Sequence, residues 1–415
     1  MRHLRLVLPF CVAASSLIHG ADWPQYRGPN RDGTSSESGW SAVWPKEGPR
    51  QLWKANVGTG SSPVTVSAGK VFTMGNSDGQ DHVFCLDSAN GKILWKHSYA
   101  SERFDQMHEG GPASAPSVDG NLVYTMGRSG EVLCLDAATG QVKWSLNVVK
   151  EFKAELPFFA YTISPLVLGS KLIVITGAKG ASTVALDKEN GKVLWKSGDD
   201  PAAYASPVPF PEGKQTHVAI FNGAGLLILN VETGAEVARH PWDTPSPMNS
   251  RVNAASPVVT GTRAFIGSSY GMGCALVEFD LAAGKAKAVW QNDELTTQYN
   301  SALYYNKHLY GFHSHGQNDG SGELRCVNVA DGKVLWSRKN PGLGSLICCG
   351  GKLIILTRGG ELITAEASPE DYKELARVQI TGSLCRNEPT LSDGKLYVRT
   401  SRGDVHCMDV SAAKE

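Results

Sequence analysis

The sequence has no excess of charge of either sign. Its 415 residues include 40 lysines and arginines and 40 aspartates and glutamates, so the formal net charge is zero. No basic stripe interrupts this balance, which argues against nucleic acid as a partner. The P-loop and H-E-x-x-H motifs are missing, and those reaction classes lose their usual support. C-x-x-C-H is missing too, which excludes a fused cytochrome.

Long apolar runs are absent beyond the first twenty residues, so no transmembrane segment is expected. Residues 1–20 begin with a basic stretch, and the apolar run LVLPFCVAA that follows is too short to span a bilayer. This pattern predicts an export signal cleaved somewhere between Ser16 and Ala21. Phe10 precedes Cys11, which argues against a lipid anchor. We therefore expect a soluble exported protein, periplasmic or secreted.

Glycine and tryptophan are abundant, with 45 and 10 copies, and they mark a repeat. Its clearest copies are VFCLDSANGKILW (83–95), VLCLDAATGQVKW (132–144), TVALDKENGKVLW (183–195) and LRCVNVADGKVLW (324–336). The turn glycines at 91, 140, 191, 234, 284 and 332 are spaced by 49, 51, 43, 50 and 48 residues. Periods of this length are typical of propellers with one four-stranded unit per period.

Each copy reads as a hairpin. An apolar run is followed by Asp or Asn, three residues, Gly and a second apolar run. The Asp or Asn side chain accepts hydrogen bonds from turn amides, and Gly supplies a positive φ. A tryptophan four residues after the glycine is expected to pack against the neighbouring unit.

Each repeat unit begins with a further pair of strands, and eight such pairs can be counted along the chain. They begin near Ser62, Ala115, Ser164, Ser206, Ser256, Ser301, Ser345 and Glu388. The last unit ends at Val410 without a fourth strand, and RQLWKANV (50–57) is a strand without a partner. Closing the ring with this N-terminal strand removes exposed sheet edges. We predict an all-β fold, an eight-bladed β-propeller of four-stranded antiparallel blades over residues 50–410, with an arm over 21–49 and a tail over 411–415.

The arm opens with DWPQYRGPNRDG (22–33), which is too irregular for a helix or strand and too rich in large side chains for a disordered tail. We expect it to cross the ring face or its outer edge and to pin the terminus. Trp23 and Tyr26 would supply buried area, and Arg27 and Arg31 would hydrogen-bond loop carbonyls.

The cysteines after residue 20 number eight, which permits disulfides in an oxidising compartment. Four of them recur at one position of the repeat, where they should lie too far apart to bridge, and we expect them to be small buried side chains. These four are Cys85, Cys134, Cys326 and Cys407. Cys348–Cys349 is the only adjacent pair, and it ends an inner strand.

LDAATGQVKW and its copies resemble the tryptophan-docking repeats of propellers of the pyrroloquinoline quinone (PQQ) type. DWPQYRGPNRDG followed by LWKANVGTGSSPV resembles the opening of PQQ-binding-like propeller proteins. The resemblance covers about residues 22–410. It implies either a quinoprotein alcohol dehydrogenase-like enzyme or a non-enzymatic scaffold similar to BamB, because the same blades serve both.

Polar residues gather in the segments that enter each unit, and these segments should converge at the central channel. Candidate cofactor-binding residues are Arg251, Asn253, Asn300, Arg386 and Glu388. Candidate ring-face binding residues are His108, Glu109, Tyr161, Tyr204, Gln298 and Asn387. The arginines could bind carboxylates, as in PQQ or an acidic sugar, and the carboxylates and amides could hold Ca²⁺. An equally weighted alternative is that these residues only solvate the channel mouth.

No dedicated metal site is predicted. His313 and His315 share a strand face, but no third ligand is identifiable. NSDGQD (76–81) resembles part of a calcium loop, lacks its terminal glutamate, and is equally well explained as a polar hairpin tip.

Two functions remain open. One is a non-catalytic, monomeric exported propeller that binds a protein, peptide or glycan on its ring face. The other, which the resemblance implies, is a PQQ- and calcium-dependent dehydrogenase of an alcohol or sugar. Such enzymes need a calcium site, a catalytic aspartate and often a disulfide between adjacent cysteines over the quinone. No calcium site or catalytic aspartate can be matched here residue by residue.

Overall fold

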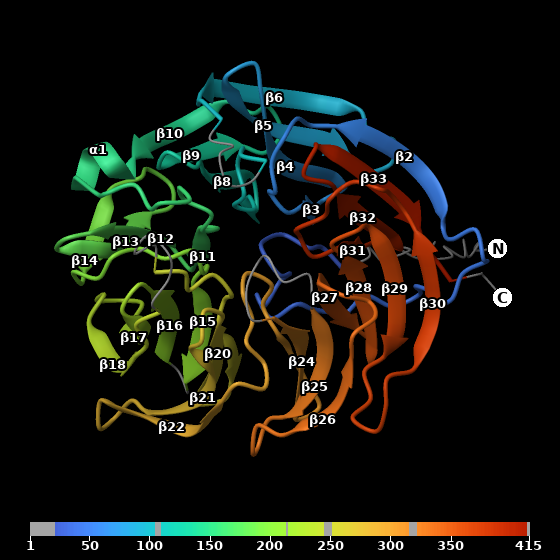
Figure 1. Ribbon diagram of the computed structural model, residues 1–415. Helices are drawn as coiled ribbons and strands as arrows, with labels where there is room; N and C mark the ends of the chain where they lie inside the picture. Colours follow the sequence, from blue (N-terminus) through green and yellow to red (C-terminus); the bar gives the residue numbers. More distant parts are fainter. Residues whose placement is uncertain (1–20, 104–108, 213–214, 245–250, 315–321, 413–415) are drawn as a thin grey trace, which may run out of the picture.

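Eight sheets form a ring around a central axis in the computed structural model (Figure 1). The structure describes residues 21–103, 109–212, 215–244, 251–314 and 322–412. Each sheet contains one blade of four antiparallel strands, and the predicted eight-bladed all-β propeller is confirmed. Among the described residues, no helix is long and apolar enough to cross a membrane. The predicted export signal, His108 and His315 lie outside the described residues.

Blades 1 to 4 follow the chain, each from its innermost to its outermost strand. Blade 1 holds β3 (Thr65–Ser67), β4 (Lys70–Ser77), β5 (Gln80–Asp87) and β6 (Ile93–Ala100). Blade 2 holds β7 (Ser117–Asp119), β8 (Leu122–Met126), β9 (Glu131–Asp136) and β10 (Val142–Asn147), and helix α1 (Val148–Phe152) follows it. Blade 3 holds β11 (Leu166–Leu168), β12 (Lys171–Ala178), β13 (Ala181–Asp187) and β14 (Val193–Ser197). Blade 4 holds β15 (Val208–Glu212), β16 (Gln215–Asn222), β17 (Gly225–Asn230) and β18 (Glu236–Pro241).

Blades 5 to 8 continue the same order, and the N-terminal part of the chain adds a strand to two of them. Blade 5 holds β19 (Val258–Thr260), β20 (Arg263–Ser268), β21 (Gly273–Asp280) and β22 (Lys285–Asn292). Blade 6 holds β23 (Leu303–Tyr305), β24 (His308–His313), β25 (Glu323–Asn328) and β26 (Val334–Arg338). Blade 7 holds β27 (Gly344–Cys349), β28 (Lys352–Thr357), β29 (Glu361–Glu366) and β30 (Glu374–Gln379), with β1 (Thr34–Ser35) parallel to β27. Blade 8 holds β31 (Thr390–Ser392), β32 (Lys395–Arg399), β33 (Asp404–Asp409) and β2 (Arg50–Asn56).

Strand β2 closes the ring, as the sequence predicts, because it pairs antiparallel with β33 as the outer strand of blade 8. Arg399 of the same blade reinforces the closure. Its guanidinium donates hydrogen bonds to the carbonyls of Ser62 and Met74 and to the Thr73 hydroxyl, all in or leading into blade 1. Burial lowers the pKa of Arg399 to about 9, so its charge persists at neutral pH.

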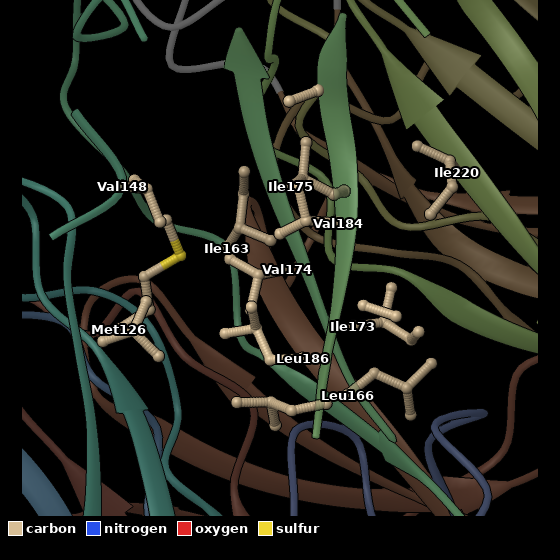
Figure 2. Packing of buried hydrophobic residues seen from close by; sticks show 14 of the residues in the cluster. Met126, Val148, Ile163, Leu166, Ile173, Val174, Ile175, Val184, Leu186 and Ile220 are labelled. Atoms are coloured by element: carbon tan, nitrogen blue, oxygen red, sulfur yellow. The ribbon is translucent and has the colours of Figure 1, made fainter. Parts of the chain in front are cut away.

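The inner strands are buried on both faces, since each blade is sandwiched between two others. In β12 every residue from Leu172 to Thr176 is buried, the pattern of a strand covered on both sides. Figure 2 shows β12 between Met126 of blade 2 and Ile220 of blade 4. Burying one aliphatic side chain of this size contributes about 1.5–3 kcal/mol. The apolar strands therefore supply the attraction that holds the blades face to face.

Tryptophans couple neighbouring blades nearer the outer edge of the ring. In six of them the indole N–H donates to a backbone carbonyl of the next blade. These bonds run from Trp53 to Ser88, Trp95 to Ala137, Trp144 to Lys188, Trp195 to Val231, Trp290 to Val329 and Trp336 to Ser368. The indole of Trp144 also leaves no room for a side chain on the turn that it faces in blade 3. A Cβ added to Gly191 in that turn would lie 2.7 Å from the Trp144 indole.

The predicted hairpin turns are confirmed. Asp136 accepts hydrogen bonds from the amides of Ala138 and Thr139, and Asn230 accepts them from the equivalent amides of blade 4. The turn glycine adopts a positive φ, for example 73° at Gly140. The eight described cysteines are all buried with free thiols, which confirms the small buried role expected for the four repeat cysteines.

The first residues of the arm lie in the middle of the ring, where Figure 1 shows them in dark blue. Trp23 exchanges two backbone hydrogen bonds with Val66 of β3. The Pro24 carbonyl accepts from Val118 of β7, and the Gly33 carbonyl accepts from Cys348 of β27. The arm therefore lies against innermost strands, inside the ring rather than around its outer edge.

Arg31 is the central side chain of the arm and is 1% exposed. Nη1 donates to the carbonyls of Ser164 and Pro207, at 3.2 and 2.9 Å. Nη2 donates to the Pro165 carbonyl and to Ser117 Oγ. One guanidinium thus binds blades 2, 3 and 4, as expected of an arginine that hydrogen-bonds loop carbonyls. Burial lowers the pKa of Arg31 to about 9. Because this value is still above neutral pH, the guanidinium remains charged.

Replacing Arg31 with methionine should destabilise the protein by on the order of 3 kcal/mol, because it leaves buried carbonyls without donors. Urea denaturation measures the loss. The matched control is Arg50→Met, which removes an exposed guanidinium paired with Asp409 and should cost no more than about 1 kcal/mol. Equal losses of stability in the two variants would show that the hydrogen bonds of Arg31 do not stabilise the fold more than an exposed ion pair does.

Gly191→Ala and Gly169→Ala should separate the collision with tryptophan from backbone strain. Both glycines have positive φ, 73° and 59°, but a Cβ at 169 meets nothing within 4 Å. We expect about 1–2 kcal/mol of destabilisation for Gly169→Ala from the left-handed backbone. Gly191→Ala should lose about 2 kcal/mol more, because its Cβ overlaps the Trp144 ring. Thermal unfolding of both variants gives the difference, and no difference would contradict the coupling of blades through this ring.

Candidate functional site

The loops that lead into the innermost strands converge on one face of the ring. We call them the inner loops, and they span 60–64, 110–116, 159–165, 202–207, 252–257, 298–302 and 386–389. They enclose a cavity of about 190 Å³. Among the described residues its lining comes from every blade except the seventh, and Tyr26 of the arm completes it.

A row of serines holds the inner loops in register. The backbone amide of Ala115 donates to Ser164 Oγ, that of Ser164 to Ser206 Oγ, that of Ser206 to Ser256 Oγ, and that of Ser256 to Ser301 Oγ, all at 2.8–3.0 Å. Each blade thus satisfies a backbone donor of the preceding one. Buried amides without such partners would be costly, so the row fixes the spacing of the loops around the channel.

The charged groups at the cavity are already paired within the chain. Arg386 binds Glu109 through Nε–H at 2.9 Å and a longer contact from Nη2. Glu388, whose side chain is 10% exposed, lies 3.7 Å from Nη1 of Arg27. Burial raises the pKa of Glu388, and the charge of Arg27 offsets part of that rise. The two pairs leave the cavity with no excess of charge.

Aromatic rings form one wall. Phe159 and Tyr204 pack edge to face with ring centroids 5.6 Å apart, and the Tyr204 hydroxyl accepts a hydrogen bond from the Phe159 amide. Burial raises the pKa of Tyr204 to about 12, so the hydroxyl is neutral. Tyr299 also lines the cavity. Beside this wall, Phe158 is 40% exposed at the surface and packs edge to face on Phe159.

Amide side chains also line the cavity. Gln298 donates from Nε2 to the Tyr270 hydroxyl, while its Oε1 is buried without a partner among the described residues. Asn300 donates from Nδ2 to the Gly344 carbonyl. A neutral cavity with an aromatic wall and amide groups suits an uncharged, partly apolar group that donates hydrogen bonds.

Six residues that the sequence singled out lie in this lining: Tyr204, Gln298, Asn300, Arg386, Asn387 and Glu388. Glu109 borders it through its bond to Arg386. Three others lie outside the lining. Asn253 is fully buried; its Oδ1 accepts a hydrogen bond from the Thr244 hydroxyl and its Nδ2 donates to the Asn222 carbonyl. The Tyr161 hydroxyl donates to the Thr176 carbonyl, and Arg251 donates to the Gly223 carbonyl. These three side chains brace loops.

Phe159, Tyr299 and Tyr26 line the cavity without having been singled out as ring-face residues. Tyr299 lies between Gln298 and Asn300, and Phe159 lies two positions before Tyr161. A search for aromatic residues within two positions of the predicted ring-face residues would have found both. Tyr26 was expected to be buried in the arm, but only the path of the arm through the ring brings it to the cavity.

The lining does not fit PQQ with calcium. PQQ carries three carboxylates, whereas the one arginine of the lining already binds Glu109, and Glu388 adds a further carboxyl group. Ca²⁺ takes six to eight oxygen ligands. Among the described residues no three His, Cys, Asp or Glu side chains gather to hold a metal ion. The adjacent thiols of Cys348 and Cys349 are buried in β27, outside the lining.

Known proteins share this architecture. A family model described as "Outer membrane protein assembly factor BamB" matches residues 41–111, 100–338 and 320–414. No curated protein matches the sequence. The crystal structure of BamB from Moraxella catarrhalis aligns with a TM-score of 0.63 at 17% identity, over 87% of this chain and 99% of that chain.

Two other solved structures show how widely the fold is used. Quinohemoprotein alcohol dehydrogenase from Comamonas testosteroni aligns with a TM-score of 0.67 at 14% identity, over 95% of this chain and 81% of that chain. Sqt1 from Saccharomyces cerevisiae aligns with a TM-score of 0.57 at 13% identity, over 87% of this chain and 99% of that chain. Such low identities show the fold alone. The family model, however, covers most of the chain, and the chain therefore belongs to the PQQ-like propeller family described as outer membrane protein assembly factor BamB.

Proposed function

We propose that this protein is an exported, non-catalytic binding module whose ring-face cavity receives a side chain or short segment of a partner protein. The observation that carries the proposal is the aromatic-walled cavity whose charges are neutralised from within, by Glu109 with Arg386 and by Arg27 with Glu388. Such a site offers apolar contact and hydrogen bonds, and the charged side chains of its described lining are already paired within the chain.

Exposed apolar side chains beside the cavity support a protein partner. Leu156 is 50% and Phe158 is 40% exposed, on the same loop that supplies Phe159 to the lining. Large apolar side chains next to a well-formed pocket are typical of protein interaction sites, where aromatic anchors dominate the binding energy. Membership of a family described as an assembly factor supports the same choice.

Export is part of the proposal and rests on residues 1–20. They combine a basic start, a short apolar run and small residues before Ala21. Among the described residues of the cavity, no feature favours a dehydrogenase.

The partner should bind through the aromatic rim. Phe158→Ser is expected to weaken the affinity for a partner purified from the exported fraction by at least tenfold, the loss typical of an interface anchor. Leu94→Ser is the matched control, because Leu94 is 46% exposed on the outer strand of blade 1. Surface plasmon resonance with the immobilised partner gives both dissociation constants. Equal affinities for the two variants would contradict binding at this face.

PQQ together with Ca²⁺ should leave the thermal unfolding of the protein unchanged. A ligand at about a hundred times its dissociation constant would add roughly 2.7 kcal/mol of stability, which is easily seen in a melting curve. Separate additions of PQQ and of Ca²⁺ serve as controls. A saturable shift that needs both components would overturn the non-catalytic proposal in favour of a quinoprotein dehydrogenase.

A further inference from the structure

Glu37 is a buried carboxylate at the start of the molecule, 8% exposed. Its oxygens accept three hydrogen bonds, and all three donors are backbone nitrogens. Oε2 accepts from Ala21 at 2.9 Å and from Asp393 at 3.0 Å, and Oε1 accepts from Gly394 at 3.0 Å. The last two belong to the turn between β31 and β32 of blade 8.

The described part of the chain offers this carboxylate no side-chain counter-ion. Among the described residues, no lysine, arginine or histidine side chain forms an ion pair with Glu37. Buried carboxylates are rarely left without a cation, because removing the charge from water costs several kcal/mol. Backbone amides stabilise the charge through their dipoles but do not neutralise it. Either Glu37 is an exception, or one of its three partners is charged in the mature protein.

Ala21 is the one partner that can carry a charge. Its nitrogen is a neutral amide only while residue 20 is attached, and it becomes an ammonium group once that bond is cut. Its neighbours fix its position. Asp22 accepts from Ser67 Oγ at 2.8 Å and from the Ala68 amide, and Trp23 exchanges two backbone bonds with Val66. These bonds fix the chain directly after Ala21 and so keep the Ala21 nitrogen beside Glu37.

We infer that Ala21 is the amino terminus of the mature chain and that its α-ammonium group is the counter-ion of Glu37. Hydrolysis of the Gly20–Ala21 bond by an export signal peptidase consumes one water, leaves a carboxylate on Gly20, and leaves an amine on Ala21 that takes up a proton at neutral pH. The inference rests on the proposed export. It assigns the cleavage, which the sequence places somewhere between Ser16 and Ala21, to the bond between Gly20 and Ala21.

The ion pair would attach the start of the arm to blade 8. Glu37 joins Ala21 to the turn at Asp393–Gly394, while Asp22 and Trp23 attach the same stretch to blade 1. These are the two blades between which β2 closes the ring. Cleavage would in this way add a charged contact at the closure, and a chain cut earlier, after Ser16, would place an uncharged amide there.

The test compares two purified chains, one beginning at Ala21 and one beginning at Gly20. They differ by a single residue, but only the first has an ammonium group at Glu37. We expect the Ala21 chain to melt at a higher temperature at about pH 6, and the advantage to be lost as the pH rises above about 8, where an α-amine releases its proton. Glu37→Gln in both chains should abolish the difference. Equal melting temperatures of the two unsubstituted chains would overturn the inference.

Mass spectrometry of the full-length chain expressed in an exporting host gives a second, independent readout. The amino-terminal peptide should begin with Ala21, and a peptide that begins at any other residue would overturn the assignment. Neither measurement involves the ring-face cavity. A failed partner assay with Phe158→Ser therefore counts against the proposed function alone, and equal melting temperatures count against the terminus alone.

Discussion

The guanidinium of Arg31 sits where the inner loops meet, and the arrangement around the axis depends on it. It binds three backbone carbonyls of blades 3 and 4 and a hydroxyl of blade 2. Carbonyls that point into a channel would otherwise need water or a ligand. The arm supplies their donor from within the chain, so this part of the centre of the propeller is occupied by the protein's own N-terminal segment.

That constraint positions the candidate site. With the arm held by Arg31, Tyr26 reaches the cavity and Arg27 comes within 3.7 Å of Glu388. The row of serines also fixes the inner loops, because each serine hydroxyl accepts a hydrogen bond from a backbone amide of the preceding blade. Four backbone amides of the loops that form the cavity are thus satisfied within the chain. If the proposed partner binds here, loops that are already held in place would reduce the entropy lost on binding.

The repeat was readable from sequence because its determinants are local. A turn glycine, an aspartate or asparagine four residues before it and a tryptophan four residues after it each act within one hairpin, and β2 was recognisable as a strand without a partner. The cavity was only partly readable. Tyr204 and Asn300 were found because they precede innermost strands, but Tyr161 and Asn253 do so too, and their side chains turn into the framework. The pairing of Arg386 with Glu109 joins residues 277 positions apart, which no local pattern reveals.

The central claim is that the arm is part of the folded ring, and native-state hydrogen exchange tests it most directly. Backbone amides bonded inside the ring should exchange only when the ring opens, whereas an arm that merely lies on the surface exchanges rapidly. The account predicts that peptides covering residues 22–33 exchange as slowly as those covering the inner strands β3 and β11. Exchange of residues 22–33 at the rate of the exposed outer turns would contradict it.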